Sequence, residues 1–404
     1  MSNRSSLARP APGGAPHPLS PSLLWVMAIA CGLCVANIYY NQPLLGEFAA
    51  QFHARAWTTG LVATAAQVGY GLGLLFFLPL GDLLERRRLI VVLIAADALS
   101  LLAVAASPSL AMLIVTQFLV GLCSIGAQIL IPLATEMAPA EQRGRIVGVL
   151  MSGVLGGILL ARVFAGLVGD WLGWRTVFVL AAAAMLVLAV ALRALLPRRE
   201  PTLAMSYPRL MHSLFGLLST PGLRSASAVS GLSFAVFVAF WTTLAFLMSD
   251  TFHQGASAAG SFGIIGLIGA AGAPWAGHLT DRKGVAFTLN LALVLVAVSF
   301  VIMGVWVTWT GLILGVLLMD LGIQSVQVAA QTEVLALRPE ARSRLNTLYM
   351  VSRFGGGAIG SALGALAWEF AGWTGVCVFS LVATVLALVI HLASFRRRAV
   401  PASV

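Results

Sequence analysis

Charged side chains are scarce in this 404-residue chain: 9% of its residues are charged, with 14 Asp and Glu against 24 Lys and Arg. A water-soluble globule of this length needs roughly a quarter of its residues charged to cover its surface. The mean hydropathy of +0.96 and the hydrophobic fraction of 59% point the same way. Composition therefore excludes a soluble globular protein.

Motifs of several enzyme and pump classes are also missing. No Gly-rich loop with a P-loop lysine occurs, which argues against ATP-driven work by this chain. Neither H-E-x-x-H nor G-x-S-x-G occurs, and the six histidines fall in tails, loops or segment ends, so we expect no enzyme activity. Cys31-x-x-Cys34 has no second ligand pair nearby and is expected to pack helices. We predict no cofactor, metal or disulfide.

The sequence does contain a succession of apolar segments, each about 20 residues long and able to cross ~30 Å of hydrocarbon as a helix. We predict twelve, at approximately 22–45, 57–79, 88–106, 109–133, 144–167, 173–196, 224–248, 257–280, 285–305, 309–333, 343–368 and 372–394. The predicted fold class is an all-α polytopic membrane protein with twelve transmembrane helices.

The basic residues are distributed unevenly between the loops on the two sides of these segments. Of 24 Lys and Arg, twenty lie in the two tails and the even-numbered loops, Arg55 and Arg175 lie in odd-numbered loops, and Arg162 and Arg353 lie within segments. Because loops rich in Lys and Arg stay in the cytoplasm, both termini and the even-numbered loops are predicted to be cytoplasmic. The net charge of +10 thus reflects membrane topology, and we expect no nucleic-acid partner.

The chain repeats itself at an offset of 199 residues. The matches are Asp82 with Asp281, "EQRGR" (141–145) with "EARSR" (340–344), Gln128 with Gln327, Met151 with Met350, Gly156-Gly157 with Gly355-Gly356, Asp170 with Glu369, and Gly173-Trp174 with Gly372-Trp373. Parallel six-span repeats are typical of one secondary-transporter architecture, which has its substrate site between the halves near the bilayer midplane.

The predicted organisation follows from this repeat. The first twenty residues are polar and rich in Pro, Gly and Ser, as expected of a disordered tail and not of a signal peptide. The apolar pattern at 210–218 predicts a short helix lying at the membrane surface. The predicted units are a cytoplasmic tail at 1–21, an N-terminal six-helix bundle at 22–196, a cytoplasmic linker with that helix at 197–223, a C-terminal six-helix bundle at 224–394 and a basic cytoplasmic tail at 395–404.

The stretch "GHLTDRKG" (277–284) resembles the G-x-x-x-D-R-x-G loop signature of the major facilitator superfamily, found between the second and third helices of each half. All four fixed positions match in this copy. The first copy, "LPLGDLLERRR", keeps Asp82 and the basic pair Arg86-Arg87 but departs at three other positions. The resemblance covers almost the whole chain and implies a transporter that works by alternating access.

The charges of this loop suit a gate between two moving bodies. A carboxylate such as Asp82 can accept hydrogen bonds from free N–H groups at the start of a helix in the other half, and the arginines can pair with Glu136 or Glu141. The alternative is a solvated turn that only enforces topology. The predicted cytoplasmic gate residues are Asp82, Arg86, Arg87, Glu136, Gly277, Asp281, Arg282 and Gly284.

A charged side chain at membrane depth costs at least ~2.5 kcal/mol on insertion scales and therefore calls for a reason. Arg162 is expected in the outer half of its segment, where Asn37, Tyr40 and Asn41 share one helical face at comparable depth. We predict a substrate site there; the alternative is an arginine tied to backbone carbonyls among helix-packing amides. The predicted substrate-binding residues are Asn37, Tyr40, Asn41, Gln67, Tyr70, Gln117, Arg162, Trp241, Gln324 and Gln327.

Three further charges lie within the apolar segments. Asp320 is midway along the tenth segment, and Arg353 could approach it although their depths differ by about 8 Å. With Arg162 they are predicted to carry a coupling proton; a static ion pair is the alternative. Asp97, in a segment that the family places at the periphery, is expected to be structural.

Two other stretches resemble exporters of the superfamily. "GVLMSGVLGG" (148–157) is similar to the antiporter signature g-x-x-x-G-P-x-x-G-G, with Ser152-Gly153 in place of Gly-Pro, and "ANIYYNQPLL" (36–45) is similar to the first helix of bacterial sugar and drug exporters. Gln117 stands where proton-coupled members often carry an arginine, so their coupling mechanism carries over only if Arg162 serves in its place.

The predicted function is secondary active transport in the bacterial cytoplasmic (inner) membrane, with proton-coupled efflux of a drug-like or sugar-like molecule as the leading version. The alternatives are an importer of a narrow metabolite, as symporter or uniporter, and a non-transporting receptor on the same scaffold. The expected partners are a small-molecule substrate, protons and the lipid bilayer, and the expected functional unit is a monomer. Few charges and several aromatic residues favour a moderately apolar or neutral polar cargo.

Overall fold

The computed structural model describes residues 20–198, 206–270 and 272–399, and every regular element in these ranges is helical. The tail predicted at 1–21 lies outside them except for its last two residues. The first half contains α1 (Pro21–Ala36), α2 (Asn41–Phe52), α3 (Ala56–Phe76), η1 (Pro79–Asp82), α4 (Arg86–Ala105), α5 (Leu110–Cys123), α6 (Gly126–Glu136), η2 (Ala140–Gln142), α7 (Arg143–Leu172) and α8 (Trp174–Leu195).

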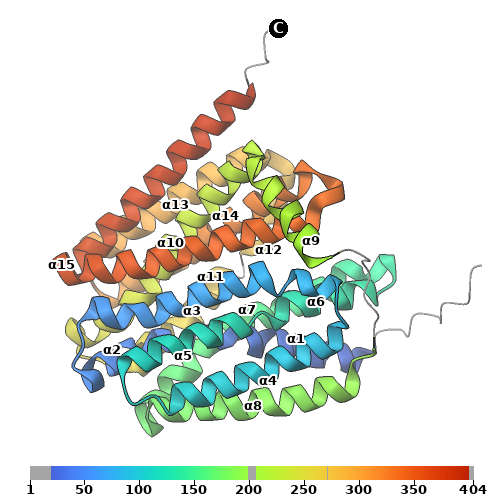
Figure 1. Ribbon diagram of the computed structural model, residues 1–404. Helices are drawn as coiled ribbons and strands as arrows, with labels where there is room; N and C mark the ends of the chain where they lie inside the picture. The colour runs from blue at the N-terminus through green and yellow to red at the C-terminus, as the bar shows by residue number, and fades with distance from the viewer. Residues whose placement is uncertain (1–19, 199–205, 271, 400–404) are drawn as a thin grey trace, which may run out of the picture.

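After the linker helices α9 (Tyr207–Phe215) and η3 (Gly216–Ser219), the second half contains α10 (Pro221–Asp250), α11 (Ala256–Ala270), α12 (Ala273–Lys283), α13 (Val285–Val305), α14 (Trp309–Leu337), η4 (Pro339–Ala341) and α15 (Arg342–Ala399). In Figure 1 the helices of the first half, blue to green, lie below those of the second half, and most helix axes run side by side. The last helix continues to Ala399, so residues 395–399 of the tail predicted at 395–404 are helical.

Ten described segments are long and apolar enough to cross a membrane. One of them, Arg342–Ser394, bends at Ala371 and Gly372 and therefore consists of two arms, 342–370 and 373–399. The shorter apolar helix α1 continues into α2 after a break. Counting the two arms of α15 separately, and α1 with α2 as one span, brings the number into agreement with twelve spans. The fold is that of an all-α polytopic membrane protein.

Three segments that the apolar pattern predicted as single helices are interrupted. The breaks lie at residues 37–40, at 124–125 and at Gly272. Pro43 and Pro274 explain two of them, because a proline ring clashes with the carbonyl four residues earlier and provides no N–H. At the third, the Ser124 hydroxyl donates to the carbonyl of Val120 at 2.7 Å, a side-chain bond that bends helices.

The helix contacts repeat with the sequence. A Cβ at Gly157 of α7 would overlap the backbone of Gly32 in α1, and 199 residues later a Cβ at Gly356 of α15 would overlap Gly231 in α10. Gly173 and Gly372, also 199 apart, both adopt positive φ angles, of 80° and 55°, where the chain turns between spans. The two halves are therefore built by the same glycine contacts and turns.

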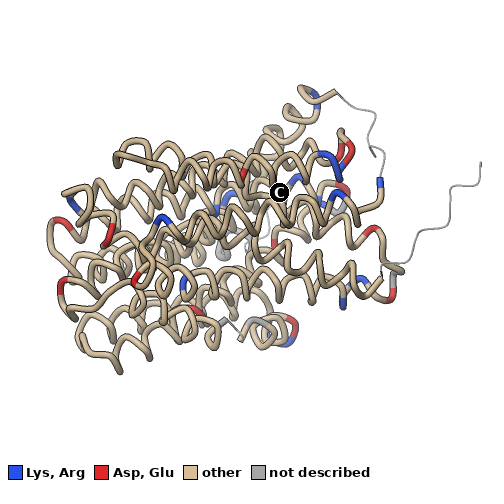
Figure 2. The backbone as a smooth tube through the Cα atoms, turned by 90° about the horizontal axis from the view of Figure 1, so that it is seen from below, with Lys and Arg blue, Asp and Glu red and all other residues tan. Residues whose placement is uncertain are grey.

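The two ends of the bundle differ in charge. We call the end with η1, η2, η4 and α9 the basic side, and the end with the turns at His53, Gly173 and His253 the opposite side. Figure 2 shows that most charged residues lie at the ends of the bundle and few in its middle. On the basic side α9 buries Leu210, Met211 and Leu214, and the Tyr207 hydroxyl donates to the Phe76 carbonyl at 3.0 Å, which links the linker to the first half.

Candidate functional site

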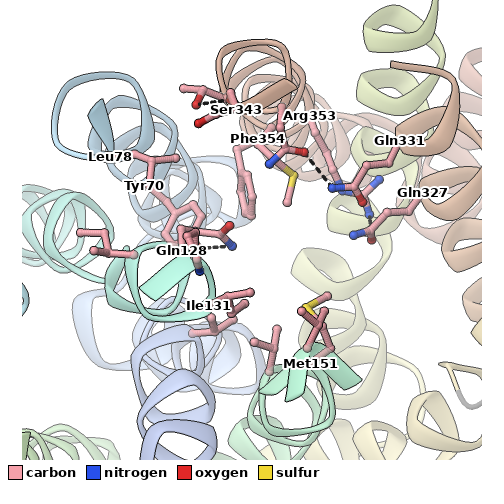
Figure 3. Close-up of a pocket in the computed structure, with 18 of the residues that line it drawn as sticks. Tyr70, Leu78, Gln128, Ile131, Met151, Gln327, Gln331, Ser343, Arg353 and Phe354 are labelled. Atoms are coloured by element: carbon pink, nitrogen blue, oxygen red, sulfur yellow. Dashed lines mark hydrogen bonds between the residues drawn. The ribbon is translucent and has the colours of Figure 1, made fainter. Parts of the chain in front are cut away.

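A cavity of about 1110 Å³ lies between the two halves and opens at the basic side. Its rim includes Asp82, Glu136 and Arg344 from helix ends of that side, and its floor includes Asp320 and Gly266 from α14 and α11. No turn of the opposite side lines it within the described ranges. Figure 3 looks into this space, with side chains of both halves facing each other across it.

Arg162 is fully buried and lies one helical turn beyond Ile158 and Leu159, which line the cavity. Its Cζ atom is 3.9 Å from the ring centroid of Trp241 and 4.8 Å from that of Tyr39, as in cation–π contacts. Nε donates to Oε1 of Gln42 at 2.9 Å and Nη1 to the carbonyl of Ile158 at 3.0 Å, whereas Nη2 has no hydrogen-bond partner in the described part of the chain. Trp241 belongs to the second half, so this arginine joins the two halves at the base of the cavity.

The predicted substrate residues divide into two groups. Tyr70, Gln324 and Gln327 line the cavity, whereas Asn37, Tyr40, Asn41, Gln67, Gln117, Arg162 and Trp241 do not. Asn37 donates to Asp97 at 2.7 Å and Asn41 to Gln117 at 3.1 Å, inside the first half. Because the helix breaks at residues 37–40, the i, i+3, i+4 spacing no longer sets a common face. Tyr39 and Gln42, absent from the predicted set, contact Arg162 instead.

Asp320 lines the floor of the cavity and is 3% exposed. No Lys, Arg or His nitrogen of the described residues lies within 4.0 Å of its carboxylate, and Oδ2 has no hydrogen-bond partner there. Gly266 and Gly269 of α11 leave the space beside it, since a Cβ at either position would come within 2.8 Å of the Asp320 side chain. An added Cβ at Gly266 would also lie 3.5 Å from Trp241, the ring that Arg162 of the other half contacts.

Arg353 does not pair with Asp320. Its Nη1 donates to the hydroxyl of Ser230 at 3.1 Å and its Nη2 to Oε1 of Gln327 at 3.0 Å, and its Cζ lies 4.3 Å from the ring centroid of Phe234. Figure 3 shows Arg353 and Gln327 on the cavity wall that faces Tyr70 and Gln128. Arg353 is therefore a wall residue with neutral partners, nearer the mouth than Asp320.

The predicted gate charges of the first half form a compact cluster at the mouth. Arg86 donates to Glu136 at 2.7 Å, to Asp82 at 3.1 Å and to the carbonyl of Gly81 at 2.8 Å. Arg87 lies beside Glu85, at 3.4 Å. All these partners belong to the first half, so the cluster does not bridge the halves in this state.

The second copy of the gate motif, Gly277–Gly284, is more open. Asp281 and Arg282 are exposed and make no ion pair with other described residues. Gly284 adopts a positive φ of 85° where α12 turns into α13. A latch between the halves by these charges stays a prediction for the state in which the basic side is closed.

On the opposite side the halves are joined by contacts that sequence reasoning did not assign to a gate. Asp170, at the end of α7, accepts hydrogen bonds from the backbone N–H groups of Ala256 and Ser257, both at 2.9 Å. These N–H groups begin α11 of the other half, and a carboxylate is favoured at such a helix start. The Ser361 hydroxyl also donates to the carbonyl of Gly60 at 3.3 Å. The carboxylate–helix latch that the sequence predicted for the basic side is thus present at the closed end.

A cavity between two repeated helical halves, open at one end and closed at the other, is the architecture of a secondary transporter. The chain belongs to the Major Facilitator Superfamily, whose family model matches residues 24–335 and 226–404. It is 42% identical over 387 residues to the transporter YgaY of Escherichia coli O157:H7, covering 95% of this chain and 98% of that protein. The protein is therefore a multi-pass membrane transporter of this family.

Two further comparisons are more distant. The chloramphenicol resistance protein of Streptomyces lividans is 26% identical over 273 residues, which are 65% of this chain and 68% of that protein. The crystal structure of a bacterial homolog of the human lysosomal transporter Spinster, in an inward-facing and occupied conformation, superimposes with a TM-score of 0.77 at 16% identity, covering 95% and 98% of the two chains. The second likeness concerns the fold alone.

Proposed function

We propose that this transporter is a proton-coupled exporter of a small organic molecule in the bacterial inner membrane. Asp320 carries the proposal: it is a buried carboxylate at the floor of the central cavity, with no cation within 4.0 Å among the described residues. Ionisable side chains at membrane depth that face a cavity mark proton relays and ion pathways. Cargo entering from the basic side reaches this carboxylate at the end of its path.

Arg162 supplies the switch in this proposal. It belongs to α7 of the first half, whereas Asp320 belongs to α14 of the second, so rocking of the halves changes the distance between the two charges. An approaching guanidinium stabilises the ionised carboxylate, and a retreating one stabilises the protonated carboxylate. A proton taken up on one side of the membrane is thereby released on the other.

Two observations support export over import. The name of the Streptomyces lividans relative, a chloramphenicol resistance protein, agrees with removal of a toxic compound from the cell. In the stretch that resembles the antiporter signature, the signature glycine Gly157 packs α7 directly against α1, since a Cβ there would overlap the backbone of Gly32. Gly153, at the position of the signature's proline, makes a second such contact with the backbone of Ala28.

The test is a susceptibility panel in an efflux-deficient bacterium. Cells express the wild type, Asp320→Asn, Arg162→Met or the control Asp97→Asn, and are challenged with toxic dyes, antibiotics and sugar analogues. Asp97 is an equally buried carboxylate, but it is held by Asn37 and Ser124 away from the cavity. We expect the wild type and Asp97→Asn to protect, and the Asp320 and Arg162 variants to fall to the level of the empty vector.

A protonophore should also remove the protection. Increased sensitivity of wild-type cells would establish import instead. Full protection by Asp320→Asn would show that the coupling proton is carried elsewhere. No change across the panel, with every variant shown by blotting to reach the membrane, would overturn the broad exporter and leave one narrow metabolite as cargo.

A further inference from the structure

A second hollow of about 510 Å³ lies between α10 and the first arm of α15, on residues that do not line the central cavity. Small residues leave it open: Gly231 and Ala235 on α10, and Gly355 and Gly356 on α15, all line it. A Cβ at Gly355 would meet no atom within 4 Å. Ile359 at its border is 59% exposed, as expected of a side chain facing lipid. The hollow is therefore a groove on the outer surface of the second half.

The basic-side end of this groove is polar. Arg224 lines it, is exposed, and has no carboxylate within 4.0 Å among the described residues. Ser227 also lines it and is 8% exposed, yet its hydroxyl has no hydrogen-bond partner there. Thr220, the residue before α10, makes no side-chain cap, and Pro221 has no N–H, so the N–H groups of Gly222 and Leu223 in the first turn of this 30-residue helix have no capping side chain.

The length of the groove matches one leaflet of a bilayer. Arg224, Ser227, Gly231 and Ala235 follow one face of α10 at spacings of three and four residues, so the groove runs for about 16 Å along the helix. That is roughly half of the ~30 Å hydrocarbon thickness. Its walls are mostly apolar, with Ser227 and Ser352 as the polar lining residues besides Arg224, and Arg224 supplies a charge at the basic side, where phospholipid headgroups lie.

The first half has the same groove position without the polar end. The residues 199 positions before Arg224 and Ser227 are Trp25 and Ala28. Gly156, the equivalent of Gly355, also has no atom within 4 Å of an added Cβ. The glycine-lined surface is therefore repeated, whereas the cation and the free hydroxyl occur only in the second half.

We propose that the groove between α10 and α15 binds one anionic phospholipid of the leaflet at the basic side. Its phosphate lies against the guanidinium of Arg224, the hydroxyl of Ser227 and the start of α10, and one acyl chain fills the space beside Gly231 and Gly355. The charge is complementary, since basic pockets between transmembrane helices at the cytoplasmic surface bind anionic headgroups. The site lies apart from the cargo cavity and does not depend on the proposed direction of transport.

The test compares two lipids on the purified, delipidated full-length chain. Dioleoyl phosphatidylglycerol or dioleoyl phosphatidylcholine is titrated in detergent, and native mass spectrometry counts the lipids retained. The wild type should retain one phosphatidylglycerol in preference to phosphatidylcholine. Arg224→Gln should reduce that preference about fivefold, the contribution of one arginine near a membrane surface, and Arg224→Lys should keep most of it.

Gly355→Leu should fill the groove and abolish retention of the single lipid, whereas the control Gly156→Leu, at the equivalent position of the first half, should leave it unchanged. Equal retention of the two lipids by the wild type would overturn the proposal. So would a preference that survives both Arg224→Gln and Gly355→Leu. If Gly355→Leu does not fold, the Arg224 variants decide by themselves.

Discussion

The two halves of this transporter share their helix contacts but not their buried charges. Gly32 against Gly157 in the first half is repeated as Gly231 against Gly356 in the second. By contrast, Arg162 corresponds to Ser361, and Asp320 to Gly121. Packing of two helices at their closest approach permits only glycine, so both copies keep it. A polar site between the halves needs each group once, so the charges are free to differ.

The largest effect is expected from variants that disrupt the glycine contacts shared by the two halves. Gly157→Val and Gly356→Val should each destabilise the protein by about 3 kcal/mol or more, because the new side chain overlaps the backbone of the facing helix. Gly156→Val and Gly355→Val, next to them on the same helices, should change stability by only a few tenths of a kcal/mol. Thermal unfolding of the purified variants measures both pairs; similar midpoints for Gly157→Val and Gly156→Val would contradict the glycine contact.

An intermediate effect is expected where the halves differ at the closed end. Asp170→Asn removes the charge from two hydrogen bonds to the start of α11 and should cost about 1–2 kcal/mol, or roughly a 5- to 30-fold shift toward opening of the opposite side. Glu369→Gln, at the equivalent position of the second half, should have little effect, since Glu369 is exposed and forms no ion pair with the described residues.

Spin labels at His53→Cys and His253→Cys report this opening, because both residues are exposed in turns of the opposite side. The native cysteines are replaced beforehand. A longer interlabel distance in Asp170→Asn, and an unchanged one in Glu369→Gln, are the expected results. An unchanged distance in both variants would show that the closed end does not depend on the Asp170 latch.

The smallest difference between equivalent positions is expected for the two copies of the gate motif. Arg86→Gln should destabilise this state by about 1–2 kcal/mol, because Arg86 is 7% exposed and donates to Glu136, Asp82 and a backbone carbonyl. Arg282→Gln should stay within about 0.5 kcal/mol, as expected of an exposed residue. Equal shifts in the unfolding midpoint of the two variants would remove the distinction between the copies.

The candidate site was only partly predictable. Membrane depth singled out Arg162 and Asp320, because charges in apolar segments are rare and require a local cause. The contacts of these charges were harder to predict. Because the helix breaks before Pro43, Asn37 and Asn41 bond within the first half. Tyr39 and Gln42 contact Arg162 instead. The repeat pairs Asp170 with Glu369, which marked this acidic position as shared by both halves. Nothing in the sequence showed that Asp170 would bond to the start of α11.

The sequence by itself determined the helical membrane fold, the repeat and the family, because long apolar segments, loop charges and the offset of 199 residues are local or periodic properties. Only the tertiary structure decided which residues meet. The contacts of Arg162 with Tyr39 and Trp241, the latch at Asp170 and the groove beside Arg224 all arise between helices far apart in the chain. Their geometry depends on helix breaks and close glycine contacts, whose effect on side-chain direction cannot be read from composition or spacing.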